Sequence, residues 1–219
     1  MLFDLRSRGR RRTVQAVYLS LAVLMGGGLV LFGVGTGSGI GGLLNAFTGS
    51  GSNNQTSVLS QQEKTALKQT KANPDSAAAW GNLEEARYEN ASSSGYDEAT
   101  STYTAAGKKE LANVASAWQR YLALTKNPTS NLAILAANAY GTLGQYANEA
   151  SAWETETAAA PTEVKGFECL AISAYAAKQT RKGDLAATKA ASMVPKASRK
   201  QLVTEIDTAK TQPTLAAQC

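Results

Sequence analysis

The chain has 219 residues, no histidine and two cysteines, and its 22 basic and 17 acidic side chains give a formal net charge of +5. Without histidine there is no imidazole for acid–base catalysis, for a Ser-His-Asp or Cys-His nucleophile, or for the usual zinc-hydrolase ligand set. No phosphate-binding glycine motif is present either, so we expect no enzyme activity, no catalytic residue, no metal site and no cofactor.

The positive charge is concentrated at the amino terminus. Against a single acidic residue, Asp4, the first dozen residues contain arginines at positions 6, 8, 10, 11 and 12. The rest of the chain is therefore nearly neutral, which argues against nucleic-acid binding. We expect residues 1–13 to be a basic cytoplasmic segment.

Val14–Val34 is an uncharged, mainly apolar stretch of 21 residues. As a helix it would be about 31 Å long, which matches a membrane hydrocarbon core of roughly 30 Å. It predicts a transmembrane helix. The alternative is a cleaved signal peptide, whose apolar region is usually shorter. Because the arginines precede it, the amino terminus should be cytoplasmic and the rest extracytoplasmic, in a single-pass protein of the cell membrane.

Residues 35–59 are rich in Gly, Ser, Thr and Asn and predict a flexible linker. Its apolar residues fit either a short helix on the membrane surface or scattered positions in coil; they are Ile40, Leu43, Leu44 and Phe47. A polar helix is expected next, over residues 60–73, and its inward positions are Ala66, Leu67 and Thr70.

Two further helices are expected at 77–90 and 109–126. The connection between them, residues 91–108, is longer than a helical hairpin needs, and such loops are usually functional or disordered. It contains Tyr96 and Tyr103. It is therefore either a flexible insertion or a loop that contacts a partner.

The segment between Pro128 and Pro161 predicts a helical hairpin, with Gly144 as the break between its two helices. The pattern recurs along the chain. Leu135–Tyr140 is echoed by Leu170–Tyr175, and prolines at positions 128, 161 and 195 repeat at a similar spacing.

A helix–turn–helix pattern with closing prolines and a period of about 34 residues resembles the tetratricopeptide repeat (TPR) family, over residues 74–195. The matching aromatic, small and turn residues are Trp80, Leu83, Tyr88, Ala117, Tyr121, Leu124, Ala137, Tyr140, Gly144, Tyr146, Trp153, Leu170 and Tyr175. Gln179 and Arg181 depart from the pattern, because Gly and Tyr are expected there. Glu149 stands where a small residue is expected.

The resemblance implies an all-α fold, in which an N-terminal transmembrane helix is followed by a TPR-like α-solenoid of about three helix pairs with capping helices, over residues 60–210. The alternative is an Ala-rich helical bundle. A final helix is expected over Lys196–Lys210, with Leu202, Ile206 and Ala209 inward, and residues 211–219 should be a disordered tail. In the predicted topology Cys169 and Cys219 lie in an oxidising compartment, where they could form a disulfide. The alternative is that Cys169 is unpaired and fills the core as a small buried side chain.

TPR solenoids bind partners in a groove lined by first-helix side chains. By this resemblance the groove residues are Asn82, Glu85, Glu89, Asn131, Ile134, Asn138 and Ser173. Residues 63–163 hold eight basic and twelve acidic side chains, whereas residues 164–210 hold nine basic and four acidic. The basic end could meet an acidic partner or anionic lipid.

We therefore expect a bacterial membrane-anchored scaffold that binds a protein or peptide partner, in a membrane complex. Its layout is similar to that of ancillary TPR subunits of the SecYEG translocon, which points to envelope protein biogenesis. The alternative is an extracytoplasmic ligand-binding or sensory accessory subunit.

Overall fold

The computed structural model describes the backbone of residues 52–219 and the side chains of residues 61–219. The predicted basic segment 1–13, the predicted transmembrane helix Val14–Val34 and the linker residues 35–51 lie outside the described residues. Among the helices that are described, none has both the length and the apolar character needed to span a bilayer.

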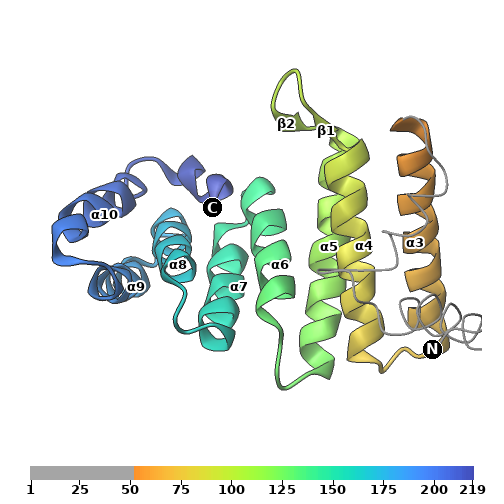
Figure 1. Cartoon of the computed structure of the whole chain (residues 1–219), viewed down its shortest axis with the longest axis horizontal. Coiled ribbons are helices and arrows are strands. Elements are labelled where there is room, and N and C mark those ends of the chain that lie inside the picture. Colours follow the sequence, from red (N-terminus) through yellow and green to blue (C-terminus); the bar gives the residue numbers. More distant parts are fainter. Residues whose placement is uncertain (1–51) are drawn as a thin grey trace, which may run out of the picture. The chain divides into compact units, whose positions relative to one another are not determined.

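Apart from one two-stranded hairpin, the described residues are helical (Figure 1). The elements are α3 (Ser52–Ala72), α4 (Ala77–Ser94), β1 (Tyr96–Asp97), β2 (Thr102–Tyr103), α5 (Ala105–Leu124), α6 (Ser130–Thr142), α7 (Tyr146–Ala159), α8 (Val164–Ala176), α9 (Thr180–Met193), α10 (Lys196–Thr208) and a final 3-10 helix, η1 (Pro213–Gln218).

The helices of residues 55–219 pack as successive pairs. α4 packs on α5, α6 on α7 and α8 on α9, and each pair also contacts the next through α5 with α6 and α7 with α8. At one end α10 packs on α9, and at the other Ala66 of α3 joins a buried cluster with Leu83 and Ala117. An all-α solenoid-like arrangement of helix pairs is therefore confirmed.

The central hairpin lies where the sequence predicts it. Gly144, between α6 and α7, has φ +70°, in the left-handed region that favours glycine. The equivalent residue between α8 and α9 is Lys178, with φ +60°. In the third pair, the residue that corresponds to Gly144 is therefore Lys178. The sequence predicted Gln179 at this place, so the expected register was wrong by one position.

The first pair differs from the prediction at its turn. α4 continues to Ser94 and α5 begins at Ala105, so most of the expected 91–108 loop is helix or strand. Between the two helices lies an antiparallel hairpin in which Tyr96 pairs with Tyr103. Gly95 and Gly107 lie in direct backbone contact at its base, where any side chain would collide with the facing backbone.

Both ends of the predicted helical domain also needed correction. α3 begins at Ser52, inside the segment 35–59 that was expected to be linker. The expected disordered tail, residues 211–219, contains η1 and ends in a disulfide from Cys219 to Cys169 of α8. Of the three side chains expected to face inward from the last helix, Ile206 and Ala209 are fully buried and Leu202 is half-buried.

Neighbouring helices, both between pairs and within one pair, interlock where a helical glycine meets a large side chain. A Cβ on Gly81 of α4 would stand 2.8 Å from Leu132 Cδ1 of α6. A Cβ on Gly166 of α8 would collide with Glu156 of α7, and one on Gly183 of α9 would collide with the ring of Tyr175. Small residues at these crossings let the helix backbones approach each other closely.

Candidate partner-binding surfaces

The predicted groove residues of α4 and α6 are brought together, and one pair of them, Asn131 and Glu85, is hydrogen-bonded. Asn131 Nδ2 donates to Glu85 Oε1 over 3.1 Å, and Asn138 Nδ2 donates to Tyr88 OH over 3.3 Å. Each bond joins α6 to α4. Asn138 is half-buried, so its amide supports the packing of these two pairs as well as facing outward.

The other predicted groove residues have different surroundings. Asn82 is exposed and donates from Nδ2 to Gln69 Oε1 of α3 at 3.5 Å, and Glu89 is exposed. Ile134 is half-buried against the main core. Ser173 is fully buried, and its hydroxyl donates to Cys169 O at 2.8 Å. Its assignment as a groove residue was wrong, because a partner cannot reach it.

The two tyrosines of the hairpin form an edge-to-face pair with ring centroids 5.1 Å apart. Tyr96 is 39% exposed, whereas Tyr103 is half-buried against the cluster formed by Ala91, Leu111 and neighbouring residues. Tyr103 therefore holds the hairpin to its helices, and Tyr96 is the tyrosine that a partner could contact.

Three glutamates are buried between helices, which the sequence did not lead us to expect. Glu84 of α4 is fully buried, and neither carboxyl oxygen has a hydrogen-bond partner within the described residues. Burial, assisted by the nearby charge of Glu85, raises the pKa of Glu84 to about 9. Burial also raises the pKa of Glu149 of α7 to about 8. Both carboxyl groups are therefore mainly protonated at pH 7.

Glu149 and Glu156 occupy space that glycines leave free. Glu149 Oε2 lies 3.1 Å from the point where a Cβ on Gly141 would stand, and it accepts no hydrogen bond within the described residues. The buried indole N–H of Trp153, which has no other partner within the described residues, opposes the rise of the Glu149 pKa. Glu156 accepts from Ser130 Oγ at 3.3 Å, and burial raises its pKa.

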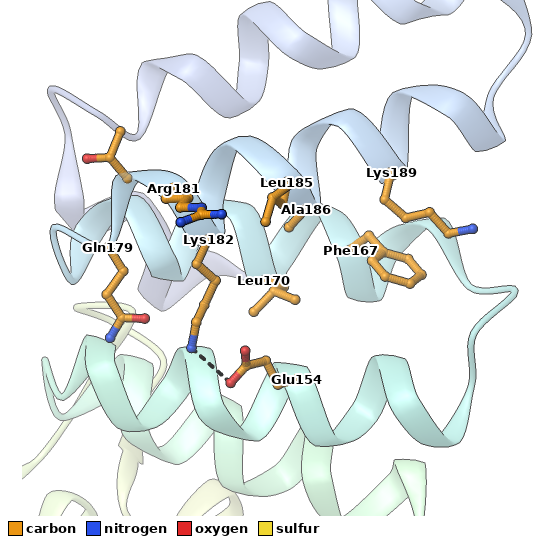
Figure 2. A pocket seen from close by; sticks show the side chains of 10 residues that line it. Glu154, Phe167, Leu170, Gln179, Arg181, Lys182, Leu185, Ala186 and Lys189 are labelled. Atoms are coloured by element: carbon orange, nitrogen blue, oxygen red, sulfur yellow. Dashed lines mark ion pairs between the residues drawn. The ribbon is translucent and has the colours of Figure 1, made fainter.

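A groove of about 700 Å³ runs between α7, α8 and α9 (Figure 2). Its apolar lining consists of Phe167, Leu170, Leu185 and Ala186. Leu185 is 66% exposed, which makes it the most exposed large apolar side chain in the described part of the chain. The sequence held a signal for it, because Leu185 falls off the buried stripe of α9 marked by Ala186 and Ala190.

Basic side chains of α9 border this α7–α9 groove. Lys182 Nζ pairs with Glu154 Oε2 of α7 at 2.8 Å, and Lys189 Nζ lies 5.7 Å from the ring centroid of Phe167. Arg181 has no ion-pair partner among the described residues. Gln179 Oε1 is buried at the same site and likewise accepts no hydrogen bond there. The groove therefore combines an apolar floor with a net positive border.

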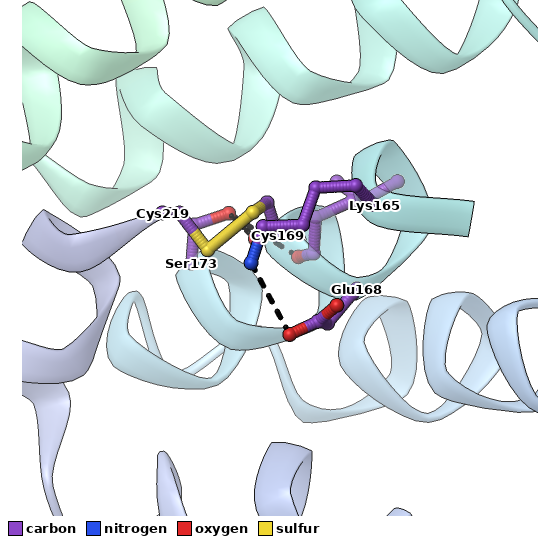
Figure 3. The surroundings of a disulfide bond; sticks show 6 residues. Lys165, Glu168, Cys169, Ser173 and Cys219 are labelled. Carbon is purple, nitrogen blue, oxygen red and sulfur yellow. Dashed lines mark hydrogen bonds and ion pairs between the residues drawn. A yellow bond between two sulfur atoms is a disulfide. The ribbon is translucent and has the colours of Figure 1, made fainter. Parts of the chain in front are cut away.

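The carboxyl end of the chain is tied to α8. Cys219 is disulfide-bonded to Cys169, closing a loop with a sequence separation of 50 residues (Figure 3). Lys165 and Glu168 lie beside the bond and form an ion pair of 3.3 Å on the same helix. η1 contacts both α6 and α8, so it covers the first helices of two successive pairs.

Comparison of the chain with protein-family models and with curated proteins finds no match in either case.

Proposed function

We propose that this protein is a membrane-anchored, extracytoplasmic TPR-like scaffold that binds a partner protein through the α7–α9 groove. The observation that carries the proposal is the groove itself, where the exposed side chain of Leu185 lies beside half-buried Phe167 and a basic border. Apolar surface rimmed by polar side chains is typical of interaction sites and binding grooves. The proposal includes a role in envelope protein biogenesis, such as an accessory part at a translocon.

The repeat geometry supports the TPR-like part of the proposal. Gly144 and Lys178 hold left-handed turns, each between the two helices of a pair. Their spacing and the helix–turn–helix content agree with the TPR period of about 34 residues. The disulfide between Cys169 and Cys219 supports an extracytoplasmic location, because such bonds persist in oxidising compartments. The anchor is proposed from the sequence of Val14–Val34.

The charge and shape of the groove favour an acidic segment with apolar side chains. Covering Leu185, which is 66% exposed, would contribute about 1–2 kcal/mol of apolar burial. Arg181 and Lys189 would attract carboxylates of the partner. Because the groove is open along α9, it suits a chain segment better than a small ligand, so the sensory alternative has no support from this site.

A photo-crosslinking residue placed at position 185 tests the proposal in cells that make the protein. The matched control is position 122 on α5, where Leu122 is 37% exposed. We expect an adduct from position 185 and none from position 122, and the crosslinked segment should be acidic and apolar. Arg181→Glu combined with Lys189→Glu should reduce the adduct about tenfold or more.

The charge control for this experiment is Arg120→Glu combined with Lys126→Glu, which reverses two exposed basic residues of the α5 region. These changes should leave the adduct at position 185 unchanged. Any of three outcomes would overturn the proposal. They are the absence of an adduct at position 185, an adduct that the charge reversal at Arg181 and Lys189 does not weaken, and a crosslinked segment that has no acidic residues.

A further inference from the structure

We infer that the partner segment in the α7–α9 groove is an amphipathic helix. On one face it presents two acidic side chains about two helical turns apart, with an apolar side chain between them. The inference rests on the function proposed above, because it assumes that the groove binds a partner protein. It adds the conformation of the bound segment and the spacing of the side chains that the groove selects.

The groove lies between two helices that do not pack extensively on each other. α7 packs on α6 and α8, whereas α9 packs on α8 and α10, so α8 supplies the floor between α7 and α9. Leu185 of α9 is 66% exposed and Phe167 of α8 is half-buried, so these two side chains offer the apolar surface. A groove with a helix on each side and apolar side chains beneath is a site in which an amphipathic helix can dock.

An ion pair joins the two sides of the groove. Lys182 Nζ of α9 lies 2.8 Å from Glu154 Oε2 of α7, and Figure 2 shows Phe167 and Lys189 together on one side of this pair. Glu154 is the acidic residue that lines the groove, and Lys182 neutralises its charge, so it repels a carboxylate of the partner less. Arg181 and Lys189 form no ion pair among the described residues and are left to bind the partner.

The spacing of the exposed side chains on α9 fits a partner helix. Arg181, Leu185 and Lys189 follow one another at intervals of four residues, so they share the outer side of α9, and all three are exposed. Arg181 and Lys189 are eight residues apart, which is about 12 Å along the helix. On a partner helix, residues seven positions apart share a face and are about 10 Å apart, so two acidic side chains at that spacing can reach both cations.

The backbone of the partner favours a helix over an extended segment. An extended segment with acidic side chains four positions apart would span a similar distance, about 13 Å. Its N–H and C=O groups would then lie against apolar side chains and against helices whose own backbone groups are bonded internally. Leu185 is such a place, because it lies inside α9 (Thr180–Met193). A helical partner satisfies its own backbone, so its burial leaves no such group unpaired.

Three synthetic peptides of equal length test the inference with the full chain in detergent micelles. The first has two glutamates seven positions apart and a leucine four positions after the first glutamate, in a background of alanine and glutamine. The second has the same composition, but its glutamates are four positions apart and the leucine lies midway between them. The third is the first peptide with a proline beside the leucine, which breaks the helix. Fluorescence anisotropy of the labelled peptides measures their affinities.

The first peptide should bind at least about tenfold more tightly than either of the others. Leu185→Ala should weaken its binding about tenfold, and so should Arg181→Glu combined with Lys189→Glu, whereas Arg120→Glu combined with Lys126→Glu should leave it unchanged. A peptide with lysines in place of both glutamates should bind the chain with the changes at positions 181 and 189, and not the wild type. That rescue would show that the cations contact the acidic side chains directly.

Failure of the first peptide to bind would overturn the inference, and so would equal or tighter binding of the second or third peptide. These results can be told apart from failure of the proposed function. If cells give an acidic, apolar adduct at position 185 and the second peptide binds best, the proposed function stands and the helical partner is refuted. If cells give no adduct and the first peptide binds best, the proposed function is refuted and the preference of the groove for a helix stands.

Discussion

Glu84 should make the stability of the helical domain depend strongly on pH. Its pKa is 4.5 in an ordinary environment and about 9 in the folded protein, so the folded state keeps a proton that the unfolded state releases. Stability therefore falls as pH rises from about 4.5 toward 9. At about 1.4 kcal/mol per pH unit, Glu84 alone should remove about 2.5 kcal/mol from the free energy of unfolding between pH 5 and pH 7.

The perturbation that isolates this effect is Glu84→Gln, which keeps the shape of the side chain and removes its titration. Urea unfolding of residues 52–219, followed by tryptophan fluorescence at pH 5, 6 and 7, should show a smaller loss of stability in the variant than in the wild type. Glu149 contributes a similar slope to both proteins, since its folded pKa is about 8. The difference between the two proteins is therefore due to Glu84.

Glu98→Gln is the matched control, because Glu98 is exposed in the hairpin. That variant should follow the wild type at every pH. If Glu84→Gln showed the same decline with pH as the wild type, the buried, protonated state of Glu84 would be refuted.

Other predictions concern packing, the turns and topology. Trp153 is 3% exposed within the main core, so Trp153→Ala should lower the free energy of unfolding by about 3–5 kcal/mol in the same urea assay. An unchanged midpoint would contradict its place in the core. Lys178→Gly should raise stability by up to about 1 kcal/mol, because φ +60° is costly for lysine, whereas Lys126→Gly, at an exposed position, should give no such gain. With Ser50→Cys, a thiol reagent that cannot cross membranes should label intact cells; labelling only after lysis would place the domain in the cytoplasm.

The helix pairs could be predicted because their signals are local. Apolar spacing, the closing prolines and Gly144 together define α6 and α7 within a few residues of their observed bounds. The third pair was harder to place in register, because lysine occupies its left-handed turn position. A lysine there gives no sequence signal, since its conformation is imposed by the packing of the helices on either side.

The features that were missed depend on contacts between distant residues. The hairpin of Tyr96 and Tyr103 forms because long extensions of α4 and α5 pack on each other, which periodicity within one helix does not reveal. The burial of Glu84 and Glu149 contradicts their polar character and depends on neighbouring helices. The ordered carboxyl-terminal residues 211–219 are joined to α8 by a bond between residues 50 positions apart. Ser173 was misplaced because repeat register alone cannot show that its side chain is fully buried.

The glycines at the helix crossings limit how the array can be rearranged. Gly81 receives Leu132, Gly166 receives Glu156, and each recess matches only the side chain of its present neighbour. Repeats of a uniform consensus can be exchanged, duplicated or removed, because every junction is the same. Here a duplicated or transposed pair would place a large side chain against a residue that has no recess. The array should therefore evolve by substitution within its existing order and resist gain or loss of whole repeats.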